Sequence, residues 1–191
     1  GISKFNNSDM SKLLADKSVS VSANIGPPTH GLSAFSTKKD LETAMQLVYL
    51  SCVDPRFNEE EYNTSLGKIK PYLDNMVNQP NYKLQQRFTE IAYEGNPRVN
   101  NLTPEVLENA QFSVIEKNYR MLFNNFKGAR FYVFGDVDLE TLKPLVQKYI
   151  GSLPVEKKPF EVIKRDMDLR QGTFEEVYEV EMETPKATAL M

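Results

Sequence analysis

Histidine, cysteine and clustered carboxylates are the side chains through which this sequence could perform chemistry, and it holds few of them. Its 191 residues include one histidine, His30, and one cysteine, Cys52. A catalytic zinc ion needs three protein ligands, typically two histidines one helical turn apart and a carboxylate or third histidine. His30 falls in a predicted strand, where we interpret it as a surface or packing residue. The sequence therefore predicts no metal site.

The other catalytic arrangements each lack a component. A Ser-His-Asp triad could use only His30, and no Gly-x-Ser-x-Gly turn is present to expose a serine. Cys52 has apolar neighbours on a predicted helix, so we interpret it as a buried structural thiol rather than a nucleophile. The run Glu59, Glu60, Glu61 opens a helix, where its negative charge meets the positive end of the helix dipole; this explains the run without a calcium site. No catalytic, cofactor-binding or metal residue is predicted.

Composition limits the class of protein. Hydrophobic residues make up 40% of the chain, charged residues 26%, and the net charge is −3, as in an ordinary globular protein. Nucleic acid is not expected as the main partner, because phosphate binding needs a concentrated basic face. No apolar run approaches the roughly 20 residues that span a membrane. A single cysteine excludes an internal disulfide and leaves the compartment unknown.

The hydrophobic periodicity predicts a strand pair followed by several helices. Residues 18–25 alternate Val19, Val21, Ala23 and Ile25 as a half-buried strand, and residues 30–36 return antiparallel to it. Thr37 and Asp40 open the next helix in the manner of a capping box. Further helices are predicted at residues 8–17, 41–53, 58–77, 80–93, 104–108 and 112–122, with Pro71 expected to kink or divide its helix.

Residues 130–154 read as strand, turn, helix and stop. An apolar run at residues 130–134 favours a buried strand, and Asp138 can accept the first N–H groups of the helix that follows. Gly151 stands where a left-handed residue would close that helix, before Pro154. We predict an α+β fold with a largely antiparallel sheet that is covered on one face by helices.

The chain becomes more polar and charged after Pro154. We expect a lobe over residues 1–154, a polar linker over residues 155–173, and one or more strands over residues 174–191 that lead into a following lobe. A final strand with no partner suggests a piece of something longer.

The ordered segments "KSVSVSANIG", "GLSAFSTKKDLETAMQLVYLSCVDPRFNEEEYN" and "FYVFGDVDLETLKPLVQKYIGSLP" resemble the pitrilysin/insulinase family of zinc metallopeptidases. The likeness is to the non-catalytic C-terminal half of the bacterial members, and it covers approximately residues 1–154. It implies bacterial periplasm or cytoplasm as the compartment. "METPKATALM" resembles the strand that opens the next lobe. The resemblance implies similar α/β lobes, grouped into two halves that clasp around a chamber enclosing an unfolded peptide.

In that family, zinc is bound in the first lobe by an inverted His-x-x-Glu-His helix and a downstream glutamate. This sequence has no such motif and no second histidine, so no zinc ligand is carried over; zinc is expected in the catalytic lobe of the parent protein. The opening strands of the lobe and the helix equivalent to the zinc helix are expected before Gly1, which makes the lobe N-terminally truncated. The family's substrate-anchoring Arg and Tyr cannot be placed.

Three functions stay open from the sequence. The first is a non-catalytic lobe of a zinc-dependent endopeptidase that forms chamber wall and lobe interface, with the catalytic half and a polypeptide substrate as partners. The second is an inactive homologue that serves as a structural or partner subunit of an active peptidase. The third is an unrelated α+β module that binds extended peptides at a sheet edge.

Overall fold

The computed structural model describes residues 1–26, 29–99, 101–161, 166–177, 179 and 186–190. These residues form two compact units. Unit 1 comprises Gly1–Glu59 and Gln111–Val162, and unit 2 comprises Glu60–Ala110 and Ile163–Met191. Each unit is described by itself below. The domain boundaries inferred from the sequence stay a prediction.

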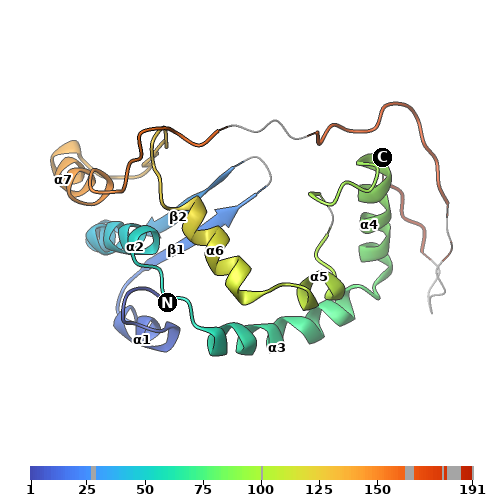
Figure 1. Ribbon diagram of the computed structural model, residues 1–191, viewed down its shortest axis with the longest axis horizontal. Helices are drawn as coiled ribbons and strands as arrows, with labels where there is room; N and C mark the ends of the chain where they lie inside the picture. The colour runs from blue at the N-terminus through green and yellow to red at the C-terminus, as the bar shows by residue number, and fades with distance from the viewer. Residues whose placement is uncertain (27–28, 100, 162–165, 178, 180–185, 191) are drawn as a thin grey trace. The chain divides into compact units, whose positions relative to one another are not determined.

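Unit 1 is built around the β-hairpin that the sequence predicted (Figure 1). Strand β1 (Val19–Ile25) pairs antiparallel with β2 (His30–Ser36), with Val19 opposite Ser36 and Ile25 opposite His30. Helix α2 (Leu41–Val53) packs on both strands. Alternating β-branched residues favour the strand, because they fit a pleated surface that is covered on one side.

The remaining helices of unit 1 frame this hairpin and helix. Helix α1 (Asn7–Leu13) is capped by Asn6, whose side chain accepts from the Asp9 N–H at 2.8 Å. The Asp9 carboxylate in turn accepts from the Asn6 N–H at 3.3 Å. The others are α6 (Phe112–Leu122), α7 (Leu139–Leu145) and a π-helical turn, η2 (Val146–Ile150), which packs against α2. Asp138 caps α7 through the Thr141 N–H at 2.7 Å, as predicted.

The core of unit 1 gathers residues that are far apart in the sequence. Cys52, Phe123 and Leu153 are buried together, and partly buried apolar side chains pack against them, among them Leu32, Tyr49 and Tyr119. Burying a side chain as large as Phe123 contributes about 1.5–3 kcal/mol. Helix α2, the end of α6 and the end of η2 are thus joined by one cluster.

The regular elements in the described part of unit 2 are helices. It contains α3 (Glu59–Met76, whose first residue belongs to unit 1), α4 (Pro80–Ala92) and α5 (Pro104–Glu108). Thr103 caps α5 by accepting from the Val106 N–H at 3.2 Å, and prolines begin both α4 and α5, where a missing N–H costs nothing. These starts agree with the sequence prediction.

Two local predictions about backbone geometry need comment. Of the two outcomes expected at Pro71, a kink or a division, the division does not occur: α3 continues through the proline, which cannot donate a backbone bond to the preceding turn. The prediction for Gly151 was wrong. Gly151 is right-handed, with φ −64°, since its N–H donates to the Val146 carbonyl across the π-helical turn. A glycine is still required there: a Cβ would lie 2.7 Å from the Gln147 carbonyl oxygen.

Thr37 and Asp40 do not form the expected capping box. A short 3-10 turn, η1 (Lys38–Asp40), precedes α2, and the Thr37 hydroxyl donates to the Asp40 carboxylate at 3.0 Å instead of accepting from the helix. The carboxylate also accepts the Ser18 N–H at 3.0 Å. Asp40 therefore joins the start of the hairpin to the start of α2.

The described sheet is small. Within the described residues the sheet contains only β1 and β2, so the fold is α+β with a two-stranded antiparallel sheet. A larger, largely antiparallel sheet that is covered on one face by helices stays a prediction. Residues 130–134 are not in a strand, because a strand exists only where a second backbone supplies its hydrogen bonds. In the expected C-terminal strand, residues 174–177 and 179 are likewise outside any strand, while 178 and 180–182 lie outside the described residues.

Candidate functional site

His30, the residue with the greatest catalytic potential, lies at the start of β2 among aromatic rings. Its imidazole makes edge-to-face contacts with Phe123, at a centroid distance of 5.6 Å, and with Phe160, at 5.4 Å. Such contacts are typical of a packing residue, which is how the sequence was interpreted. The ring thus helps join the hairpin to the end of α6.

The hairpin end around His30 forms an open hollow. The residues that line it are Ala23, Asn24, Ile25, Gly26, Thr29, His30, Gly31, Leu32 and Ser33. None of them is a carboxylate or a thiol, so this hollow does not complete a ligand set around the imidazole.

The acidic run lies where the sequence placed it. Glu59 is the first residue of α3, and Glu60 and Glu61 follow in its first turn. Across the described ranges, no group of three histidine, cysteine or acidic side chains is placed to hold a metal ion. The zinc ligands that the family resemblance implies for a catalytic lobe therefore have no counterpart among the described residues.

Cys52 is buried in the core of unit 1 with 7% of its surface exposed. Burial raises the pKa of its thiol to about 12, because an apolar environment disfavours the thiolate. The neighbouring Tyr119 donates its hydroxyl proton to the Ser51 carbonyl at 3.0 Å, and its pKa is raised to about 12, first by burial and then by Cys52. Neither group is a nucleophile at neutral pH.

Asp40 is the buried polar residue whose role the sequence did not reveal. Only 3% of its surface is exposed, and its pKa is lowered chiefly by the Ser18 N–H, then by the Thr37 hydroxyl and Lys17. The Lys17 ammonium lies 3.7 Å from its second oxygen. The spacing of Thr37 and Asp40 was the available signal, but it was assigned to helix capping. Asp40 is a structural node.

The most distinctive surface is an apolar strip over residues 131–134. Tyr132 and Phe134 are 68% and 88% exposed, and their rings stack with an interplanar angle of 6°. Phe131 and Val133 are also exposed. Contiguous exposed apolar residues are uncommon on a monomeric soluble protein and are typical of interaction surfaces and ligand-binding grooves.

Comparisons with known proteins define the fold. No family model matches the chain, and no curated protein matches its sequence. Solved structures do match: the chain has the fold of a segment found in several proteases, at low sequence identity.

Three of these structures can be named. The periplasmic protease PqqL from Escherichia coli matches with TM-score 0.68 and 19% identity over 89% of this chain and 19% of that chain. A protease from Helicobacter pylori matches with TM-score 0.68 and 17% identity over 89% and 41%. A variant of the ferredoxin protease FusC, in complex with Arabidopsis ferredoxin, matches with TM-score 0.64 and 16% identity over 87% and 18%. The chain therefore spans less than half the length of each.

The described helices include none with the length and apolarity to cross a membrane.

Proposed function

We propose that this chain is a non-catalytic lobe of a zinc-dependent endopeptidase of the pitrilysin/insulinase type. Its role is to form part of the wall of a chamber that encloses a polypeptide, and to pack against the catalytic half. The observation that carries the proposal is a match over most of this chain to three proteases, each of which is much longer. Zinc and the water it activates then belong to another lobe.

Two features of the chain support the assignment of catalysis to another lobe. The side chains in the described ranges do not assemble a metal ligand set, and the one imidazole is committed to aromatic packing. The apolar strip at residues 131–134 offers a surface suited to a neighbouring lobe. The FusC structure holds a ferredoxin, which supports a polypeptide as the class of substrate.

The test combines metal content with turnover. The chain is equilibrated with excess zinc, passed through a desalting column, and assayed for bound zinc by mass spectrometry and for cleavage of an unfolded peptide. The expected result is no stoichiometric zinc and no turnover. His30→Gln is the matched control, because it removes the imidazole and should leave any residual zinc signal unchanged. One tightly held zinc per chain together with turnover contradicts the proposal.

The second candidate is an inactive homologue that serves as partner of an active peptidase. The absent ligand set is compatible with it, since such a protein would lack the ligands throughout. The two candidates differ in the parent polypeptide: an inverted His-x-x-Glu-His helix elsewhere in the same chain favours the first, and its absence favours the second. The third candidate, an unrelated peptide-binding module, loses support from the protease matches.

A further inference from the structure

Residues 166–176, here called the strap, lie along helix α4 within unit 2. The strap contains no helix or strand, and it is attached to α4 and to the turn that follows this helix. Three attachments join the strap to that helix or turn. The Asn96 side-chain amide donates to the Asp166 carbonyl at 2.7 Å, and the Arg170 N–H donates to the Ala92 carbonyl at 2.8 Å. The Arg87 guanidinium donates two hydrogen bonds to the Glu176 carboxylate, at 2.7 and 2.9 Å.

These attachments have a consistent register. As the strap advances from Asp166 to Glu176, its partners on the helix side go back from Asn96 to Arg87. The strap therefore runs antiparallel to α4. Backbone and side-chain groups both take part, so the docking depends on the backbone conformation of the strap as well as on its charge.

A bend allows the strap to keep this register. Six residues of extended chain, from Arg170 to Glu176, would span about 20 Å, whereas the five-residue rise from Arg87 to Ala92 covers about 7.5 Å. Gly172 absorbs the difference with φ +107°, a conformation that favours glycine. The bend places the centroid of the Phe174 ring 3.5 Å from the Arg170 guanidinium carbon.

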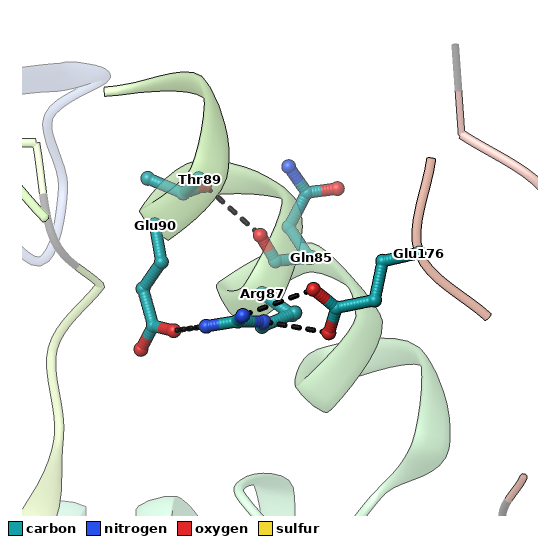
Figure 2. A network of polar contacts seen from close by, with 5 residues as sticks. All are labelled: Gln85, Arg87, Thr89, Glu90 and Glu176. Carbon is teal, nitrogen blue, oxygen red and sulfur yellow. Dashed lines mark hydrogen bonds and ion pairs between the residues drawn. The ribbon is translucent and has the colours of Figure 1, made fainter. Parts of the chain in front are cut away.

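Each side of this contact supplies one arginine to an ion pair with a glutamate of the other side. Arg87 of α4 binds Glu176 of the strap through two parallel bonds and also binds Glu90 at 2.9 Å (Figure 2). In return, Arg170 of the strap lies 3.6 Å from Glu94, just beyond α4. Arg87 is about half exposed, so solvent and salt screen these pairs and each one is weak. Docking at this strength is reversible.

We propose that helix α4 is a docking surface for the chain's own strap, and that the strap docks and releases reversibly, with the Arg87–Glu176 pair as its latch. Release frees residues 166–176 from unit 2, whereas docking holds the chain on α4 as far as Glu176. This inference is independent of the proposed function, because it concerns only contacts within unit 2.

The experiment measures how accessible the strap is in the full chain. Trypsin cleaves after Arg170, and the docked strap protects this bond because the Arg170 N–H is bound to the helix. Cleavage is followed by mass spectrometry at 50 mM and 1 M sodium chloride. A synthetic peptide with the sequence of residues 166–176 corrects for any effect of salt on trypsin itself.

Glu176→Gln should increase the corrected cleavage rate at 50 mM salt by about two- to fivefold, the range expected for an exposed ion pair. Glu175→Gln is the matched control: it removes the same charge one position away and should behave as wild type. The charge swap Arg87→Glu with Glu176→Arg should restore protection. In 1 M salt, wild type should approach the rate of Glu176→Gln.

Amide hydrogen exchange at Arg170 gives a second readout, since only the docked strap protects that N–H. Slow labelling of Cys52 in every variant verifies that unit 1 remains folded. Equal cleavage and exchange rates in wild type, Glu176→Gln and the charge swap, with no dependence on salt, would overturn the proposal. So would an equal effect of Glu175→Gln and Glu176→Gln, because the effect would then be one of net charge.

Discussion

The Tyr149 hydroxyl donates a hydrogen bond to the Glu42 carboxylate, 2.8 Å away, across 107 positions of the sequence. The same carboxylate accepts from the Lys148 ammonium at 3.0 Å, and Gln46 donates to the Tyr149 oxygen at 3.1 Å. These polar contacts join helix α2 to the η2 turn. They lie at the edge of the hydrophobic core, which joins the same two elements.

Glu42 should make the stability of unit 1 depend on pH. Its pKa is lowered from the ordinary 4.5, first by Lys148 and then by the Tyr149 hydroxyl. A lowered folded-state pKa gives a contribution that is fully present above 4.5 and is lost as pH falls through the folded-state value. Urea midpoints measured from about pH 6 down to about pH 3 should therefore fall more steeply for wild type than for Glu42→Gln. Glu140→Gln, at the start of α7, is the control. If it flattens the dependence of the urea midpoint on pH as much as Glu42→Gln does, Glu42 is not the group responsible.

Removal of the Phe123 ring should produce the largest loss of stability in unit 1. The ring is 2% exposed and touches Tyr119, at a centroid distance of 4.6 Å, as well as His30. Phe123→Ala should cost about 3–5 kcal/mol in urea unfolding, because a cavity is added to the lost transfer free energy. Phe134→Ala removes the same ring from an exposed position and should change stability by less than about 0.5 kcal/mol. Equal losses would place Phe123 outside the core.

The Cys52 thiol should be inert in the folded chain. Its pKa of about 12 and its burial leave almost no accessible thiolate at pH 7.5. Labelling with a disulfide reagent should be slow and should accelerate sharply in urea. Ser152→Cys in a Cys52→Ala background places a thiol at an exposed position and should react rapidly. Fast stoichiometric labelling of native Cys52 would contradict the structure.

Two glycines in helical segments should respond in opposite directions to alanine. In Gly151→Ala the new Cβ would meet the Gln147 carbonyl oxygen at 2.7 Å, so the chain must shift and stability should fall by about 1–3 kcal/mol. Gly67 lies inside α3 with nothing near its Cβ position, so Gly67→Ala should stabilise by about 0.5–1 kcal/mol. Thermal and urea unfolding check both signs, and a neutral Gly151→Ala would refute the crowding argument.

Most helices and the hairpin could be predicted because their signals are local. Val19 to Ile25 alternate, Thr103 and Asp138 cap helices, and prolines start α4 and α5; each signal lies within a few residues of the structure it determines. Residues 130–134 have the composition of a strand, yet pairing is not a local property. Gly151 was assigned the conformation common after an α-helix, and the π-helical turn before it could not be foreseen.

For the candidate site, too, some properties follow from the sequence and others only from tertiary packing. The inability of this chain to build a zinc site from paired histidines follows from the sequence alone, because a single imidazole cannot supply two ligands at any fold. Where that imidazole lies, between Phe123 and Phe160, depended on packing between segments more than 90 residues apart. The Asp40 node, the Tyr149–Glu42 bond and the docking of the strap on α4 were likewise decided by tertiary structure, since each one joins groups whose approach no local pattern encodes.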